Sequence, residues 1–183
     1  MPLKVLTLNI WNDDGPWTQR LALIRECIAA LDPDLIGFQE VLRGRDVDQL
    51  AALCDGRGYH VDYIEAQRFW KDPSRAFGNA VASRWHIAER HTLALPDRGD
   101  GETRAALTCR IDAPFGPVAF TSTHLNWKLH QSDTRQEQAR ALAAHVLATR
   151  PRGGFPPIVV GDFNAEADSD EVRFLCGLHT IDG

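Results

Sequence analysis

Short apolar segments that end in a polar residue alternate with segments of helical period along the chain. Residues 4–9 (KVLTLN) and 34–40 (DLIGFQE) both have the apolar character of buried strands and a polar last residue. Between them, apolar residues recur at the spacing of one helix face, which predicts a helix with Thr18 as its N-cap and a stop at Asp32-Pro33. The start of the chain therefore reads as strand, helix, strand.

The same criteria predict the elements that follow. Strands are expected at residues 59–64, 78–84, 104–111, 118–124 and 157–161, and helices at residues 46–54, 133–148 and 168–176. Asp168 and Glu171 resemble a capping box at the start of the last helix. Because hairpin-like pairs interrupt the alternation of strands and helices, we expect an α/β (α+β) fold class, a four-layer sandwich of two mixed β-sheets flanked by helices.

Composition narrows the class of protein. Hydrophobic residues make up 44% and charged residues 25% of the 183 residues, which is typical of one globular domain, expected here over residues 1–183. The net charge of -5 argues against a generally basic, nucleic-acid-binding surface, although a bound divalent metal could supply local positive charge. Four scattered cysteines predict ordinary thiols, with disulfides as the alternative, and no apolar segment has the length of a membrane span. We therefore expect a cytoplasmic protein without a transmembrane segment.

Four predicted strands end in polar residues that a buried strand does not need. These residues are Asn9, Glu40, His124 with Asn126 behind it, and Asp162 with Asn164. Strand ends at one edge of stacked sheets can meet in one pocket, where a carboxylate and an amide oxygen suit Mg²⁺. His and Asn side chains could hold phosphate oxygens, and Asp162 could orient or deprotonate a water molecule. Together these residues suit metal-assisted hydrolysis of a phosphate ester.

Each of these residues also has a purely structural interpretation. Asn9 could end its strand in an Asx-turn, and Glu40 could be a solvated charge where a strand ends. His124 could be a core imidazole bonded to the backbone, and Asp162 with Asn164 could cap a turn. The order and setting of the whole set favour the functional interpretation.

The segments LTLNIW, DLIGFQEV, GNAVASR, STHLN and VVGDFNAE, in this order, resemble the endonuclease/exonuclease/phosphatase superfamily, which has a deoxyribonuclease-I-like fold. The resemblance runs from about residue 3 to residue 176. It implies that Asn9 and Glu40 hold Mg²⁺, or Mn²⁺, with Glu40 as the principal ligand. His124 would bind the scissile phosphate, Asp162 would position or activate the attacking water, and Asn164 would steady the transition state.

Weaker parts of the resemblance concern the surroundings of this site. Glu102 and Arg104 stand where family members often have a polar pair near the phosphate or the histidine, and with Asn126 they are expected to bind substrate. A loop charge and a surface strand residue are the alternatives for Glu102 and Arg104. Arg135 and Gln138 match a recurrent pair that we interpret as structural, tying the long helix to the sheet.

The family pattern ends with a strand that carries an Asp-His pair, and the last segment here, GLHTIDG, does not match it. We therefore expect a domain that is incomplete at its C-terminus. The alternative is a natural truncation that lacks a catalytic base and leaves sheet edges unpaired, which favours aggregation or a protein partner.

The sequence thus predicts a Mg²⁺-dependent phosphoesterase acting on a nucleic acid, a nucleotide or a small phosphate ester. The alternative is a non-catalytic binding or scaffold module that keeps the fold but lacks the catalytic base. A nuclease would need aromatic and basic side chains around the site, although most such residues could equally pack loops onto the sandwich. The candidates are Trp11, Trp17, Phe69, Trp70, Lys71, Arg75, Arg84, Trp127 and Lys128.

Overall fold

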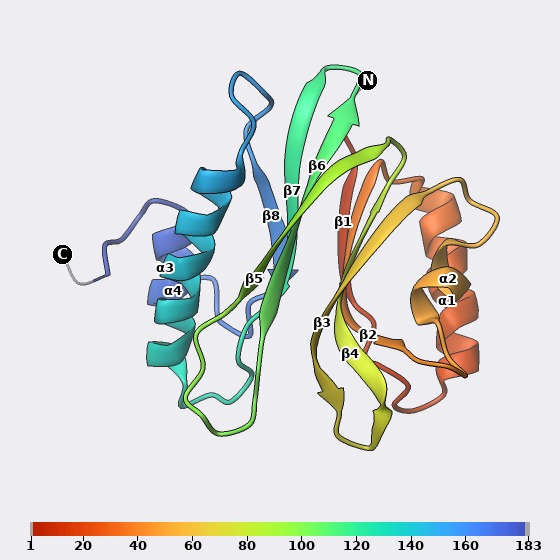
Figure 1. Ribbon diagram of the computed structural model, residues 1–183, viewed down its shortest axis with the longest axis horizontal. Coiled ribbons are helices and arrows are strands. Elements are labelled where there is room, and N and C mark those ends of the chain that lie inside the picture. Colours follow the sequence, from red (N-terminus) through yellow and green to blue (C-terminus); the bar gives the residue numbers. More distant parts are fainter. Residues whose placement is uncertain (1, 182–183) are drawn as a thin grey trace.

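The computed structural model describes residues 2–181 and shows two β-sheets packed face to face, with helices on both outer sides (Figure 1). The N-terminal sheet has the order β1-β2-β4-β3 and the C-terminal sheet the order β5-β6-β7-β8. The strands are β1 (Val5–Asn9), β2 (Leu35–Arg43), β3 (His60–Phe69), β4 (Asp72–Ser83), β5 (Ile87–Ala94), β6 (Ala105–Ala113), β7 (Gly116–His124) and β8 (Ile158–Asp162). Pairs β1–β2 and β7–β8 are parallel and the other pairs are antiparallel.

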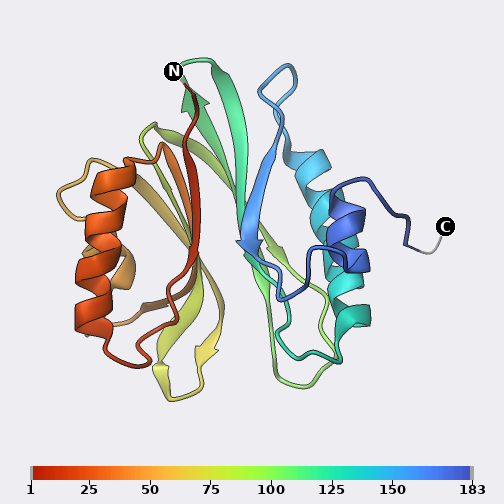
Figure 2. The same ribbon diagram turned by 180° about the vertical axis from the view of Figure 1, so that it is seen from behind.

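The helices form the outer layers of the sandwich, as the view from behind shows clearly (Figure 2). Helices α1 (Trp17–Leu31) and α2 (Gln49–Cys54) cover the N-terminal sheet, and α3 (Ser132–Thr149) and α4 (Asp170–Leu175) cover the C-terminal sheet. The predicted four-layer sandwich of two mixed sheets is confirmed. Within residues 2–181, no helix is long and apolar enough to span a membrane.

Several predicted helix starts are wrong because other residues make the caps. Helix α1 begins at Trp17 with Pro16 as its N-cap, so Thr18 lies inside the first turn and is not the N-cap. Helix α2 begins only at Gln49, where the Asp48 side chain accepts a hydrogen bond from the Ala51 amide. Helix α4 follows Ser169, and Glu171 is fully buried rather than part of a capping box.

Strand β5 was not predicted, and its burial explains why. It pairs with β6 alone and lies at the edge of its sheet, so none of its residues is fully buried. Its sequence IAERHTLA carries charged residues on exposed positions and lacks the apolar run of the inner strands. The alternation of apolar and polar residues in this edge strand is therefore too weak to predict the strand from the sequence.

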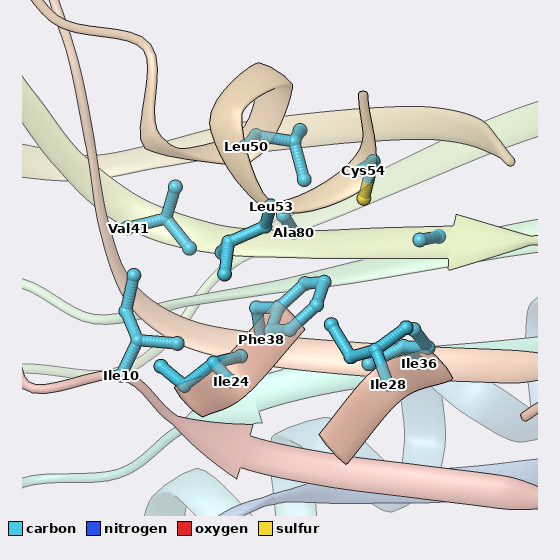
Figure 3. Close-up of a cluster of buried hydrophobic side chains, with 11 residues drawn as sticks. Ile10, Ile24, Ile28, Ile36, Phe38, Val41, Leu50, Leu53, Cys54 and Ala80 are labelled. Atoms are coloured by element: carbon cyan, nitrogen blue, oxygen red, sulfur yellow. The ribbon is translucent and has the colours of Figure 1, made fainter. Parts of the chain in front are cut away.

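Strand β2 is the central strand of the core because both of its faces are buried. Ile36 and Phe38 point towards α1 and α2, where they pack against side chains such as Ile28 and Leu53 (Figure 3). Leu35, on the opposite face, packs in a second cluster between the two sheets. Burial on both faces explains why residues 34–40 are apolar without interruption.

Gly37 marks a close approach of the two sheets. A Cβ atom at this position would lie 2.4 Å from Val160 Cγ2 and 3.1 Å from Ser122 Oγ. The Ser122 hydroxyl donates to the Phe38 carbonyl at 3.3 Å and accepts a hydrogen bond from Gln39 Nε2 at 3.2 Å. This contact fixes β2 against β7 and β8 close to the polar ends of these strands.

We predict that Gly37→Ala destabilises the protein by about 1–3 kcal/mol, because the added methyl group overlaps Val160 and the sheets must separate. Chemical denaturation measures the loss. Val160→Ala removes the overlapping methyl group, so the double variant should be more stable than the sum of the single effects predicts. Strict additivity of the two substitutions would contradict a direct contact.

Candidate active site

The polar strand residues meet at one edge of the sandwich, towards the lower side of Figure 1, where β1, β7 and β8 end. Register places Asn9 beside Gln39 and His124 beside Asp162. Glu40, His124, Asp162 and Asn164 line a cavity of about 680 Å³ that opens at this edge. The structure therefore brings together residues that are far apart in the sequence.

Glu40 does not end its strand, as the sequence pattern suggested, but lies in a bulge within β2. The pairing of β2 with β4 shifts register between Phe38 and Val41, and Glu40 has a φ angle of 62°. A left-handed conformation is uncommon for glutamate, and a bulge redirects the side chain it carries. The local backbone thus turns the Glu40 carboxylate into the cavity.

Two asparagines hold the Glu40 carboxylate. Asn9 Nδ2 donates to Glu40 Oε1 at 3.0 Å and Asn12 Nδ2 donates to Glu40 Oε2 at 2.8 Å. Asn12 is buried and has a φ angle of 40°, a conformation that asparagine tolerates better than most residues. The sequence analysis missed Asn12, although a second asparagine three residues after Asn9 could have indicated it.

Asn9 also links the two sheets. Its Nδ2 atom donates to Asp162 Oδ2 at 2.9 Å, while its Oδ1 atom accepts a hydrogen bond from the Trp11 amide at 2.9 Å. One amide group therefore holds a carboxylate from each sheet, Glu40 from β2 and Asp162 from β8. Two like charges this close repel each other unless a cation or these donors compensate.

The donor set at this edge fits a hard divalent cation that is only partly held by protein. Among residues 2–181, His, Cys, Asp and Glu side chains form no group of three or more that could hold a metal ion. Mg²⁺ needs no such group, because it commonly binds one or two carboxylates and keeps waters or substrate phosphate as its other ligands. Glu40, with Asp162 opposite, could hold it in this way. Asn9 could join them only through Oδ1, since its Nδ2 atom donates to both carboxylates.

His124 is buried, and its burial together with Arg104 sets its protonation. Arg104 Nη1 lies 3.1 Å from His124 Nδ1, and a guanidinium can only donate, so we assign Nδ1 as the acceptor and Nε2 as the protonated atom. Burial, and then the Arg104 charge, lower the pKa of His124 to about 3, against the opposing effect of Asp162. Near neutral pH the ring is an uncharged N–H donor facing the cavity.

Arg104 is held in turn by Glu102. Glu102 Oε1 accepts hydrogen bonds from Arg104 Nε at 3.1 Å and Nη2 at 2.8 Å, and both side chains are almost buried. Both residues line the cavity, where substrate binding was predicted for them. Glu102 also accepts a hydrogen bond from the Trp127 amide at 3.3 Å and lies 3.7 Å from Lys128 Nζ. The Arg104 guanidinium contacts Glu102 and His124, so Arg104 acts on the site through the histidine.

Asn164 completes the floor of the cavity. Its φ angle of 49° and the hydrogen bond from its amide to Asp162 Oδ1, at 3.0 Å, form a tight turn after β8. The Asn164 Nδ2 atom donates to the Leu125 carbonyl at 3.0 Å and lies 2.9 Å from His124 Nε2. Because Nε2 carries the ring proton in the assigned tautomer, this second contact is an approach of two N–H donors and not a hydrogen bond. Phe163, between the two polar residues, packs against a cluster that contains Leu142, as alternation along a strand requires.

Asn126 lies outside this cavity, and we assign it a structural role in place of the predicted contact with substrate. It is fully buried, donates from Nδ2 to Gln131 Oε1 at 3.1 Å and accepts at Oδ1 from Gln138 Nε2 at 2.7 Å. Arg135 binds the buried Glu171 at 2.7 Å and donates to the Lys128 carbonyl at 2.9 Å. Arg135 and Gln138 therefore have structural roles, as predicted, but they tie α3 to the loop after β7 and to α4 rather than to the sheet.

The aromatic and basic candidates fall into two groups. Trp11, Trp70, Trp127 and Lys128 line the cavity, with each indole more than half exposed. The others lie elsewhere or are already paired: Trp17 and Phe69 pack in the hydrophobic clusters, and Lys71, Arg75 and Arg84 form ion pairs with aspartates. The packing interpretation is confirmed for Trp17 and Phe69, whereas substrate contact stays a prediction for the residues that line the cavity.

The fold and the site define an enzyme-like sandwich in which polar strand ends from both sheets line one cavity. The sequence profile of the Endonuclease/Exonuclease/phosphatase family matches residues 6–180, and the chain belongs to this family.

Three relatives illustrate the similarity. Carbon catabolite repressor protein 4 homolog 3 of Arabidopsis thaliana is 27% identical over 172 residues, which are 87% of this chain and 35% of that protein. An endonuclease/exonuclease/phosphatase from Beutenbergia cavernae is 28% identical with a TM-score of 0.74, over 90% of this chain and 48% of that one. A mannosyl-6-phosphatase from Bacteroides thetaiotaomicron is 21% identical with a TM-score of 0.75, over 96% of this chain and 70% of that one. The chain therefore spans about a third of the curated relative and half of the first structure.

We predict that Arg104→Gln raises the pKa of His124 by about one unit or more, because the lost positive charge had disfavoured protonation of the ring. Histidine ring NMR across a pH series measures this directly, with wild-type His124 remaining neutral and protonated on Nε2 through the neutral range. Arg110→Gln is the matched control, since Arg110 pairs with Glu89 on the other side of the sheet. An unchanged pKa in Arg104→Gln would contradict the assigned role of Arg104.

Proposed function

We propose that this protein is a Mg²⁺-dependent phosphoesterase, which hydrolyses a phosphodiester or phosphomonoester by metal-assisted attack of water. The observation that carries the proposal is that hydrogen-bond acceptors with negative charge and hydrogen-bond donors line the same cavity. Glu40 and Asp162 supply two carboxylates, and His124 and Asn164 supply two N–H groups. Carboxylates suit a cation, and N–H groups suit the oxygens of a phosphate whose charge grows during attack.

Each residue then has a defined part in the reaction. Glu40 would hold Mg²⁺, or Mn²⁺, and Asn9 would join it through Oδ1 in place of the contact with the Trp11 amide. The ion would supply electrostatic stabilisation of the phosphate charge when bound. Asp162 is oriented by Asn9 and by the Asn164 amide, and it would accept a hydrogen bond from the attacking water. The neutral His124 Nε2–H would donate to a non-bridging oxygen of the phosphate, with no proton to give up or take.

The relatives support the reaction class and leave the substrate open. The family name covers nucleases and phosphatases, and one structural neighbour is named as a mannosyl-6-phosphatase. A nucleic acid, a nucleotide and a small phosphate ester are all compatible with the residues at the floor of the cavity. A non-catalytic binding or scaffold module is the second candidate function.

Hydrolysis of bis(p-nitrophenyl) phosphate and p-nitrophenyl phosphate tests the proposal. We expect turnover with Mg²⁺ or Mn²⁺ that is lost with a chelator, and a fall of about 10²–10⁴ in kcat for Asp162→Asn. Glu89→Gln, on the exposed edge strand β5, serves as the matched control and should retain full activity. A protein that stays inert with both metals on every ester tried would favour the scaffold function instead.

A separate prediction concerns Asn12, which donates a hydrogen bond to Glu40, the proposed principal metal ligand. Asn12→Ala should raise the Mg²⁺ concentration needed for half-maximal activity about 10–100-fold, because Glu40 loses one of its two orienting donors. Activity at saturating Mg²⁺ should recover much of its wild-type value. A lower kcat with an unchanged Mg²⁺ requirement would show that Asn12 acts on the reaction in another way.

A further inference from the structure

The charges around the cavity divide it into a floor and a wall. The floor contains Glu40 and Asp162, whose carboxylates are held by amide donors and have no Lys or Arg partner among their recorded contacts. With a divalent cation, these two carboxylates make a place for one phosphate group. The wall consists of the loops around the floor, and its lining residues include Trp11, Asp14, Trp70, Asp100, Glu102, Arg104, Trp127 and Lys128.

On the wall, carboxylates are matched by cations. Asp100 pairs with Lys128 at 2.9 Å, Glu102 pairs with Arg104 at 2.8 Å, and Asp14 pairs with Lys71. The hydrogen bond between Asp100 and Lys128 lowers the pKa of the aspartate and raises the pKa of the lysine, so both stay charged and paired at neutral pH. The wall thus carries many hydrogen-bonding groups and no excess of positive charge.

Three indole rings line the same cavity. Trp11, Trp70 and Trp127 are 55%, 57% and 59% exposed, and they come from three separate loops around the cavity. Trp70 lies at the β3–β4 turn, which approaches the same edge of the sandwich as the strand ends (Figure 1). Exposed indoles that line a cavity offer flat apolar faces to a ligand, and about 680 Å³ is within the usual size of small-molecule sites.

We propose that the substrate is a monophosphate ester of a neutral polyhydroxy compound, that is, a sugar phosphate. This inference rests on the proposed phosphoesterase function and specifies its substrate class. A sugar ring packs its C–H face on indole, and its hydroxyl groups both donate and accept hydrogen bonds. They can therefore match a wall on which carboxylates alternate with ammonium and guanidinium groups.

The same observations argue against a nucleic acid strand. Each phosphate after the first needs its own cationic contact, because phosphate neutralisation by Lys and Arg supplies most of the affinity for nucleic acids. The two cations that line the cavity, within residues 2–181, are Arg104 and Lys128, and both are already paired. A nucleobase is also a poorer match, since its edge has a fixed order of donors and acceptors and several acceptors would face carboxylates.

Binding is the first test, because it does not depend on turnover. Isothermal titration calorimetry with Asp162→Asn in Mg²⁺ compares glucose 6-phosphate with glucose, inorganic phosphate, AMP and a short oligothymidylate. We expect glucose 6-phosphate to bind at least about 10-fold more tightly than each of the others, equivalent to about 1.4 kcal/mol. Equal or tighter binding of AMP or the oligothymidylate would overturn the inference.

Two variants on the same background test the reason for this preference. Trp70→Ala should weaken glucose 6-phosphate binding about 10-fold, whereas Phe115→Ala should leave it unchanged. Phe115 is a half-exposed aromatic residue at the β6–β7 turn, at the opposite end of the sandwich. Asp100→Asn removes the closer of the two carboxylates beside Lys128, the other being Glu102 at 3.7 Å, and should strengthen oligothymidylate binding several-fold. An unchanged glucose 6-phosphate affinity in Trp70→Ala, or an unchanged oligothymidylate affinity in Asp100→Asn, would contradict the role of the wall.

Turnover by the wild-type chain separates this inference from the proposed function. Higher kcat/KM for glucose 6-phosphate than for AMP supports both. Hydrolysis of p-nitrophenyl phosphate with no preference for the sugar phosphate would overturn the substrate class alone. Selective binding of glucose 6-phosphate without hydrolysis of any ester would overturn the phosphoesterase function and support the substrate class as a binding specificity.

Discussion

The candidate site depends on one amide group that bridges the two halves of the sandwich. Asn9 Nδ2 donates to Glu40 in the N-terminal sheet and to Asp162 in the C-terminal sheet, so the two carboxylates come together only if the sheets keep their spacing. Gly37 makes that spacing short, because a larger residue would meet Val160 on β8. A packing constraint in the core therefore sets the geometry of charges at the edge, and a site so close to the sheet interface is sensitive to substitutions that never touch it.

Charge and burial then decide how the residues at the edge can react. Glu102 holds Arg104, and Arg104 holds His124 in its neutral form with a proton on Nε2. A cationic neighbour and a buried position both oppose protonation of the ring, so His124 can donate a hydrogen bond to a phosphate oxygen but is a poor proton acceptor. In the proposed reaction Asp162 would therefore accept the proton of the attacking water, which gives the two residues distinct parts.

The sequence could reveal the floor of the cavity because its residues follow from strand periodicity and chain order. Asn9, His124 and Asp162 stand where apolar strands end, and Glu40 stands in a run of apolar residues that has no use for a charge. The part that could not be predicted depends on loop conformation or on distant partners. Asn12 reaches Glu40 only through a left-handed backbone, and Glu171 resembled a helix cap because its true partner, Arg135, lies 36 positions away. Asn126 follows the same strand as His124, but Gln131 and Gln138 take its side chain into the interior.

The floor of the cavity carries the groups for the proposed chemistry, and the wall carries the groups that can select between ligands. The floor holds carboxylates that have amide donors but no Lys or Arg partner among their recorded contacts, together with N–H donors. These groups suit a cation and a phosphate, whatever alcohol the phosphate is attached to. The wall is built on loops in which each acidic residue named above already has a basic partner, so it can distinguish ligands by shape and hydrogen bonding but hardly by net charge. The chain as a whole carries a net charge of -5, so no general positive field draws polyanions towards the cavity. Selectivity at such a site must come from short-range contacts, and the exposed indoles are the largest short-range surface that the wall provides.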